Sequence, residues 1–316
     1  LSVMSVNLLT PALLFSKMTE TLDPSLLVEL WNEPLFYFIY GGFSLLWSRV
    51  GCRILKINKE YARLCDVATF FSNTNTLPVS LIKSIALSAG SHFLLKDADD
   101  TPLKVAARGV SYAMIFATLN NILRWSFGVA LMGGMDSKNK SAFNSLCSAV
   151  RGAQKIWNSI QSCITPPVYA ITAAFIVIII EPLHKAFMDQ NHVLYTIWSA
   201  IDMCGDACVP LILISLGGQL GVIEIAEQSI SAAEQRKGIV LVLVGRFVFV
   251  PTLAVILLTT LRVMFPALLP IMANDPVYML TLLILSSTPP AINLITVSQA
   301  TGKFETEAAQ ILFYGY

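Results

Sequence analysis

Apolar stretches separated by short polar connections follow one another along almost the whole chain. An α-helix needs roughly 20 apolar residues to cross a bilayer, so the pattern predicts about nine membrane segments. They cover residues 1–18, 33–54, 62–90, 105–133, 166–188, 193–222, 238–265 and 276–301, with a short final stretch over 307–316. The longest polar interval, 135–163, predicts either an amphipathic interfacial helix or a solvated loop.

Two of these segments are interrupted near their middle by prolines among polar residues. The first interruption reads TFFSNTNTLPVSLI over residues 69–82, and the second reads LLILSSTPPAINLITVSQ over residues 282–299. A membrane helix that gives up backbone hydrogen bonds must satisfy them against protein, water or a ligand, because lipid offers none. Two such breaks in corresponding halves of a chain are typical of the binding sites of secondary transporters.

The composition agrees with a membrane protein. Of the 316 residues, 55% are hydrophobic and 13% are charged, whereas a soluble domain carries about 25% charged residues. The net charge of +1, without a basic cluster among aromatics, disfavours a nucleic-acid partner. Cys204 and Cys208 lie one helical turn apart, but the histidines fall in predicted connections, so we expect small packing residues rather than a metal site. We expect no disulfide framework and no cofactor.

Charges in the connections predict the orientation. The connection around Asn58 is strongly basic and the connection around Asp99 is acidic. Because basic residues mark the cytoplasmic side, we expect the Asn58 loop to be cytoplasmic and the Asp99 loop to lie on the opposite side. By the same rule, Arg124 and Arg246 are interpreted as topology anchors near cytoplasmic helix ends.

The two halves of the chain resemble each other. LLTPALLFS at residues 8–16 matches CVPLILIS at 208–215, and TLPVSL can be aligned with TPPAIN so that Pro78 stands opposite Pro290. An odd number of spans per repeat makes the two copies inverted in the membrane. We therefore predict a first repeat over 1–134, a cytoplasmic connection over 135–163 and a second repeat over 164–316.

The interruptions supply the candidate binding residues. Half-helix N-termini at such a crossing each carry about half a positive charge, and their free N–H groups bind carboxylates or other anions. The alternative is that the polar residues only cap kinked helices, or, for Asn120 and its neighbour Asn121, that they join helices. The candidate substrate-binding residues are Asn73, Asn75, Thr76, Pro78, Asn120, Ser287, Thr288, Pro289, Pro290 and Asn293.

Three ionisable residues are candidates for ion coupling. Asp202 and Asp206 lie four residues apart, on one helix face, and could bind a proton or cation or lie in an aqueous mouth. Lys83 lies inside the first interrupted segment, where it could attract an anion, pair with a carboxylate or extend to the interface. An intramembrane aspartyl protease would need a GxGD motif, and MCGDAC lacks its first glycine. We therefore expect no enzymatic activity.

Several motifs in order resemble one family. NLLTPALLFSK, SNTNTLPVSL, LRWSFG, PPVYA, VPLILISLGGQL and SSTPPAINLITVSQ are similar to the auxin efflux carrier, or PIN-like, family, closest to its fungal members. The resemblance implies an all-α membrane protein of ten helices in two inverted five-helix repeats, with broken fourth and ninth helices crossing at the substrate site. This chain would then lack the first helix and most of the last.

The resemblance also bears on individual residues. Asn120 matches the position of a polar substrate-contacting residue on the fifth helix of the plant carriers. Those carriers hold an aspartate–lysine pair on the third helix, but the matching stretch here, FYFIYGGFSLLWS, has none. The coupling ion, if any, therefore stays open.

The sequence as a whole predicts a secondary-active carrier that moves a small organic, anionic, auxin-like solute by alternating access. A channel, or a membrane receptor or scaffold, is the alternative. By resemblance we expect the protein in the endoplasmic reticulum membrane, with the plasma membrane as the alternative. A homodimer is a possible assembly state.

Overall fold

The computed structural model describes residues 4–21, 32–74, 76–88, 90–96, 100–133, 166–221, 230–264, 271 and 274–316. All regular elements within these ranges are helices. The chain forms two compact units that each draw on both halves of the sequence. Unit 1 comprises Leu1–Thr21, Asn121–Glu227 and Asn293–Gln310, and unit 2 comprises Leu22–Asn120, Gln228–Ile292 and Ile311–Tyr316. This division does not test the predicted repeats, and the connection over 135–163 lies outside the described residues.

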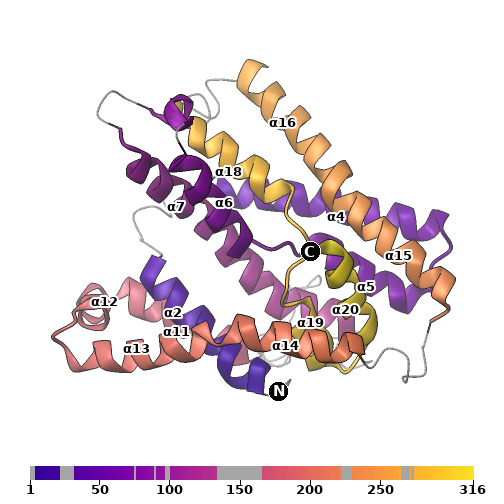
Figure 1. Cartoon of the computed structure of the whole chain (residues 1–316), viewed down its shortest axis with the longest axis horizontal. Helices are drawn as coiled ribbons and strands as arrows, with labels where there is room; N and C mark the ends of the chain where they lie inside the picture. Colours follow the sequence, from indigo (N-terminus) through magenta and orange to yellow (C-terminus); the bar gives the residue numbers. More distant parts are fainter. Residues whose placement is uncertain are drawn as a thin grey trace, which may run out of the picture. The chain divides into compact units, whose positions relative to one another are not determined.

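Unit 2 holds one helix that is long and apolar enough to cross a membrane. This helix covers the 33 residues Ala232–Met264 and consists of α15, a π turn and α16 in succession. It lies alongside α4 (Figure 1). The Ser231 side chain caps its start by accepting the N–H of Glu234. The helices of unit 2 are α4 (Glu33–Ile54), α5 (Lys59–Phe70), α6 (Thr76–Ala86), η2 (Ser91–Leu94), α7 (Pro102–Leu123, as far as Asn120), α15 (Ala232–Val244), η4 (Gly245–Phe249), α16 (Val250–Met264), α18 (Pro276–Ser286) and the end of α20 (Glu305–Gly315).

One end of unit 2 is formed by the turn between α4 and α5. Asn58 caps α5, since its side chain accepts the N–H of Glu60, and its own N–H donates to the carboxylate of Glu234 at the start of α15. That the Asn58 loop is cytoplasmic stays a prediction of the charge rule. The sequence places Asn58 in a connection without a structural role, whereas in the structure it caps α5.

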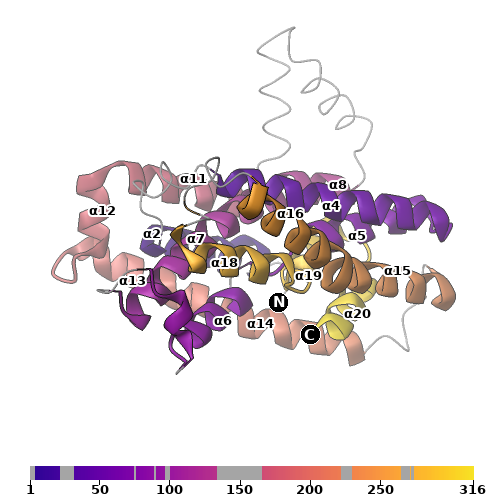
Figure 2. The same cartoon turned by 90° about the horizontal axis from the view of Figure 1, so that it is seen from above.

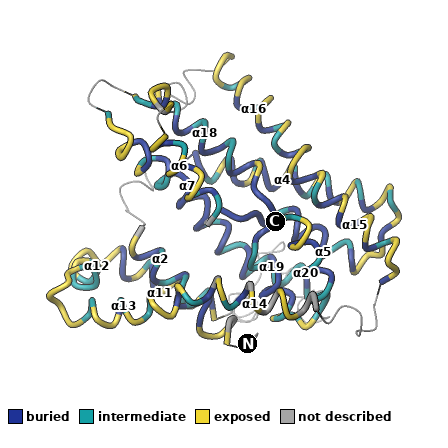
Figure 3. Tube along the Cα trace, in the orientation of Figure 1, coloured by how far each residue is buried: buried dark blue, intermediate teal, exposed yellow. Residues whose placement is uncertain are grey.

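Unit 1 is built around α2, which packs against α11 and α13. Gly205 permits this packing, because a Cβ there would lie 2.7 Å from the Cα of Leu13. α11 and α12 meet at a bend of 104°, visible in Figure 2, and α12 has no buried residue (Figure 3). The helices of unit 1 are η1 (Ser5–Leu9), α2 (Thr10–Thr21), η3 (Arg124–Gly128), α8 (Val129–Gly133), α11 (Pro166–Ile179), α12 (Glu181–Met188), α13 (Val193–Asp206), α14 (Cys208–Gly221), α19 (Leu294–Thr301) and most of α20.

Fewer continuous apolar helices appear than the hydrophobic pattern suggests. Among the described residues, Ala232–Met264 alone has the length and apolar composition of a single membrane span. The bent pair α11 and α12 has that length and composition only when its two helices are taken together. The segment predicted over 62–90 is divided into α5 and α6, and that over 276–301 into α18 and α19. α4 has 22 residues, but tyrosines, serines and glycines interrupt its apolar run.

Candidate substrate site at two paired helix interruptions

The backbone that follows α5 pairs with the backbone that follows α18. Ser72 and Pro290 form an antiparallel bridge. The N–H of Asn73 donates to the carbonyl of Pro289, and the N–H of Ala291 donates to the carbonyl of Phe71, each at 2.9 Å. The two interruptions thus satisfy each other's backbone groups, as burial away from water requires. We call residues 71–74 and 288–291 the bridge site.

The prolines of the two interruptions have different local roles. The sequence aligns Pro78 with Pro290, but the residue that faces Pro290 in the bridge is Ser72. Pro78 is buried in the first turn of α6, where its missing N–H has no helical partner to lose. Pro289 and Pro290 are buried, and their carbonyls accept bonds from the protein.

A buried arginine holds the bridge site. Arg246, in the π turn η4, is 2% exposed. Its Nε and Nη2 donate to the carbonyl of Thr288 at 3.0 and 2.7 Å, and its Nη1 donates to the carbonyl of Thr69 at 3.4 Å. Nη2 also donates to the Thr288 hydroxyl at 3.3 Å. The interpretation of Arg246 as a topology anchor is therefore wrong, because its side chain lies inside unit 2 rather than at a helix end.

The carbonyls that Arg246 binds belong to two helix ends. Thr69 is in the last turn of α5, and Thr288 lies two residues after α18. A helix C-terminus carries about half a negative charge, so one guanidinium roughly balances the two ends. Among the ion pairs of the described residues, none includes Arg246. The N-terminal end of α6, with its positive half charge, follows directly in the chain.

Asn120 holds the first interruption in place. Its Nδ2 donates to the carbonyl of Ser72 at 2.9 Å and to the hydroxyl of Thr74 at 3.0 Å, while its Oδ1 accepts from the Tyr37 hydroxyl at 3.3 Å. The side chain is fully buried. In this conformation Asn120 joins helices, and a substrate that bound it would have to replace one of these partners.

Tyr316 links both interruptions. Asn73 is buried, and its Nδ2 donates to the Tyr316 hydroxyl at 2.7 Å, which in turn donates to the carbonyl of Pro290 at 3.0 Å. Ser287 is exposed, and its hydroxyl bonds back to carbonyls of α18, as that of Thr288 does. Asn75 and the Thr76 side chain lie outside the described residues.

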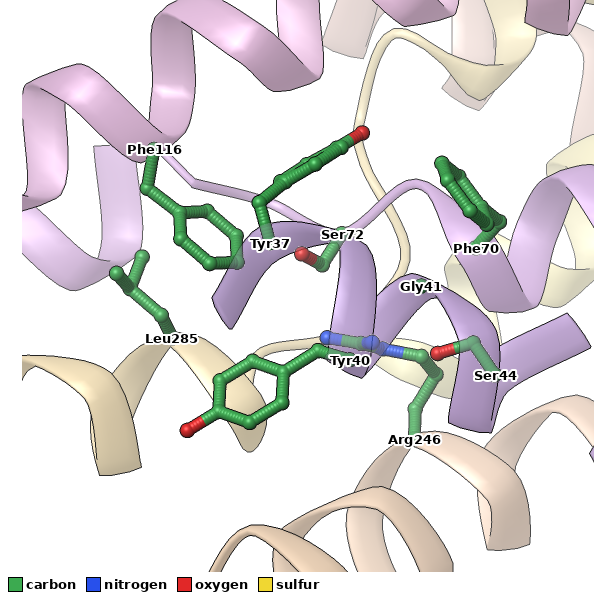
Figure 4. A pocket seen from close by; sticks show the side chains of 9 residues that line it. All are labelled: Tyr37, Tyr40, Gly41, Ser44, Phe70, Ser72, Phe116, Arg246 and Leu285. Atoms are coloured by element: carbon green, nitrogen blue, oxygen red, sulfur yellow. The ribbon is translucent and has the colours of Figure 1, made fainter. Parts of the chain in front are cut away.

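The cavity at the bridge site is small. Its volume is about 10 Å³, which is about enough for one water molecule. Figure 4 shows the guanidinium of Arg246 reaching toward this cavity, with Leu285 entering from α18. Unit 2 is therefore closed at this point, and an organic solute could enter only if the lining moved. The lining residues are Tyr37, Tyr40, Gly41, Ser44, Phe70, Ser72, Phe116, Arg246 and Leu285.

A second, larger cavity lies at the turn between α4 and α5. Its volume is about 480 Å³, and Arg49 at its wall pairs with the buried Asp66 at 3.6 Å. It lies at the basic connection around Asn58, for which the cytoplasmic side stays a prediction. It is lined by Arg49, Cys52, Arg53, Lys56, Ile57, Lys59, Ala62 and Asp66.

The candidate coupling residues lie elsewhere. In unit 1, Asp202 and Asp206 share the ammonium group of Lys17, at 2.9 and 3.3 Å. Sequence reasoning overlooked Lys17, which lies 185 residues from Asp202. Lys83 is exposed near the end of α6, as a side chain that extends to the interface would be.

Two further asparagines belong to unit 1. Asn293 does not cap α19 with its side chain, although its carbonyl accepts the N–H of Val297 at 3.0 Å. The Oδ1 of Asn121 accepts from the Nη1 of Arg124 at 3.3 Å, and both side chains are buried. Arg124 is therefore not an exposed topology anchor. Within the described part of the chain, no group of three or more His, Cys, Asp and Glu side chains could hold a metal ion.

Comparison with known proteins identifies the family. The sequence model of the family described as membrane transport protein matches residues 1–316. An uncharacterized transporter of Schizosaccharomyces pombe and one of Saccharomyces cerevisiae are each 26% identical, over 100% of this chain and 84% of their own length. Protein PIN-LIKES 1 of Arabidopsis thaliana is 23% identical over 97% of this chain and 66% of its own length. No solved structure matches. The chain belongs to the membrane transport protein family, related to the auxin efflux carriers, and is an integral membrane transporter.

Proposed function

We propose that the protein is a secondary-active carrier that moves a small organic anion by alternating access, with the bridge site as part of its substrate site. The observation that carries the proposal is the pairing of two interrupted helices around a buried guanidinium without a carboxylate partner among the described residues. Interrupted helices that meet at a site inside the protein are the usual binding architecture of such carriers.

The charges around the bridge site favour an anion. The guanidinium of Arg246 offsets the negative ends of α5 and α18, so the positive N-terminal end of α6 is left unopposed. Asn73 and Asn120, the polar side chains beside it, carry no charge. A carboxylate placed there would accept N–H bonds at the first turn of α6, where Asn75 and Thr76 are proposed contacts.

Alternating access explains why the cavity is closed. A cavity of about 10 Å³ admits no organic solute, so the described conformation corresponds to a state without substrate at this point. We propose that the solute enters when the side chains over the bridge site separate. The inverted repeats, an auxin-type carboxylate, the endoplasmic reticulum membrane, a homodimer, and the contacts of Ser287 and Asn293 remain predictions from the sequence.

The proposal is tested with the full chain in proteoliposomes. We expect saturable uptake of indole-3-acetate or benzoate that other carboxylates inhibit and the uncharged indole-3-ethanol and benzyl alcohol do not. Conductance in planar bilayers without saturation would instead indicate a channel. Stabilisation of the purified protein by a carboxylate without any flux would indicate a receptor.

Substitution of Asn75 distinguishes a substrate-binding role of the polar residues from a purely structural one. Asn75→Leu removes a donor and an acceptor beside the bridge, at about 1–3 kcal/mol, which corresponds to a loss of roughly five- to 150-fold in substrate affinity. The matched control is Thr252→Val, which removes an exposed hydroxyl of α16 that donates to the carbonyl of Val248 in the preceding π turn η4. Unchanged affinity and rate in a folded Asn75→Leu variant would restrict the polar residues to a structural role.

A further inference from the structure

A buried carboxyl group at the start of α4 has no partner among the described residues. Glu33 is 0% exposed, and neither of its carboxylate oxygens accepts a hydrogen bond from them. None of the ion pairs among the described residues includes it. It therefore differs from Asp202 and Asp206, which both pair with the ammonium group of Lys17.

The side chains around Glu33 also carry polar atoms without partners. Tyr40 follows Glu33 by two turns of α4, and Phe36 between them contacts both Tyr40 and Tyr278 of α18, with ring centres 6.3 and 6.4 Å apart. Figure 4 shows the Tyr40 hydroxyl directed away from Arg246. Buried oxygens that lack a hydrogen-bond partner within the described ranges belong to Asn32, Glu33, Tyr40, Tyr278 and Thr281.

Arg108, which interacts with Tyr112 as Glu33 does, is already bound to other carboxylates. Arg108 of α7 donates through Nη1 and Nη2 to Asp100 at 2.9 and 2.8 Å, and through Nε to Asp275 at 2.9 Å. The Tyr112 hydroxyl also donates to Asp275, at 2.8 Å. The titratable groups that interact with Glu33 from α4, α7 and α18 are the phenols of Tyr40, Tyr112 and Tyr278. Arg108 and Asp275, which interact with Tyr112, are already paired with each other.

An ionised carboxylate cannot be stable in these surroundings. Taking an unpaired charge out of water costs several kcal/mol even after the protein relaxes, and no donor here compensates it. The carboxyl group can avoid this cost by holding a proton. It would ionise only when water reaches it.

We propose that Glu33 is a proton-binding site of the transport cycle. Its carboxyl group holds a proton in the closed conformation, and the O–H bond breaks, with the proton passing to water, when the start of α4 is hydrated. Proton binding at Glu33 stands on its burial and its lack of a partner among the described residues, while its part in transport rests on the proposed carrier function.

The protonation state can be measured without transport. The full chain in phosphatidylcholine nanodiscs is titrated by infrared difference spectroscopy, which detects the carbonyl stretch of a protonated carboxyl group. We expect such a band at neutral pH in the wild type and in Glu60→Gln, which alters an exposed carboxylate of α5, and its loss in Glu33→Gln. A band that persists in Glu33→Gln, or is missing from the wild type, overturns the proposal.

The thermal stability gives a second readout. Because the folded chain holds a proton that the unfolded chain releases, stability falls as pH rises above the ordinary titration range of a glutamate. Glu33→Gln, which mimics the neutral form, should remove this decline while Glu60→Gln keeps it. A pH profile of Glu33→Gln that matches the wild type contradicts the inference, and so does stabilisation by sodium at constant pH.

Transport then tests coupling. In proteoliposomes, an imposed proton gradient should stimulate benzoate uptake by the wild type, and Glu33→Gln should lose this stimulation while it retains exchange of benzoate for benzoate. Stimulation that survives in Glu33→Gln but disappears in Asp202→Asn would place coupling at the aspartates and overturn the assignment. If the wild type shows no flux, the carrier proposal fails, and the infrared band still decides whether Glu33 binds the proton.

Discussion

Arg246 and Glu33 are both buried ionisable side chains of unit 2, and the fold treats them in opposite ways. The N–H groups of Arg246 donate to two carbonyls and a hydroxyl, while the oxygens of Glu33 accept no bond from the part of the chain that the structure describes. A guanidinium does not lose its proton in proteins, so the surrounding backbone must supply its acceptors. A carboxyl group can become neutral. The comparison shows that one buried charge is fixed and the other group can change its charge.

Arg108 provides a third case. It is partly exposed and lies between Asp100 and Asp275, so its charge is cancelled by carboxylates rather than by helix ends. This arrangement joins α7 to the start of α18, where Asp275 also caps the helix through the N–H of Val277 at 3.0 Å. Arg108 therefore has a structural role. Of these two arginines, Arg246 is the one whose charge is balanced by helix ends rather than by carboxylates.

Substitution of Arg246 is the most direct test of this comparison and should have the largest effect. Arg246→Met keeps much of the volume but leaves the carbonyls of Thr69 and Thr288 without their donor, at about 1–3 kcal/mol for each. We expect a marked fall in thermal stability and loss of transport. Arg246→Lys, which restores one cationic donor, should recover part of both. Thermal unfolding and proteoliposome flux measure the effects, and a Met variant as stable and active as the wild type would mean that the guanidinium does not hold the bridge site.

Asn120 tests whether neutral groups hold the bridge site as well. Asn120→Leu removes the donors to Ser72 and Thr74, so we expect a loss of about 1–3 kcal/mol in stability. Tyr37→Phe removes only the donor to the Asn120 oxygen and should cost about 0.5–1.5 kcal/mol. Thermal unfolding of both variants, beside Thr252→Val as the control, gives the comparison. Equal losses in the Leu and Phe variants would contradict the role of the two Nδ2 bonds.

The smallest effect is expected at Asp100. Its hydrogen bonds with Arg108 hold the pKa of the Asp100 carboxyl at about 2, below the unfolded value of about 3.9. The pair therefore stabilises the protein above about pH 4, and this contribution is lost as the pH falls from about 4 through about 2. Asp100→Asn should lower stability at neutral pH by about 1 kcal/mol or less.

The pH profile of the unfolding temperature checks this prediction. The difference between wild type and Asp100→Asn should shrink as the pH falls below about 4, because the wild-type carboxyl then becomes neutral too. Glu60→Gln, whose exposed carboxylate has no such pair, serves as the control. A difference that stays constant down to the lowest usable pH would show that Arg108 does not act on Asp100 by charge.

The sequence by itself determined the features that depend on local pattern. Apolar composition predicted the membrane, and ordered motifs predicted the family that the comparisons show. Prolines among polar residues marked the two interrupted stretches: Pro289 and Pro290 follow the end of α18, where a missing N–H and the clash of the ring disfavour further helix, and Pro78 lies in the first turn of α6. These properties need no knowledge of which other segment lies nearby.

The tertiary structure alone decided which distant groups meet. That Ser72 rather than Pro78 faces Pro290 is a matter of register between two segments, which no local pattern fixes. Arg246 was misassigned because the charge rule relates basic residues to loops and does not account for the carbonyls of two helix ends. Glu33 resembles any glutamate at a helix start, and only the folded structure shows that it is buried and lacks a partner among the described residues. The energy of a buried charge depends on its surroundings in space, and those are set by residues far away in the chain.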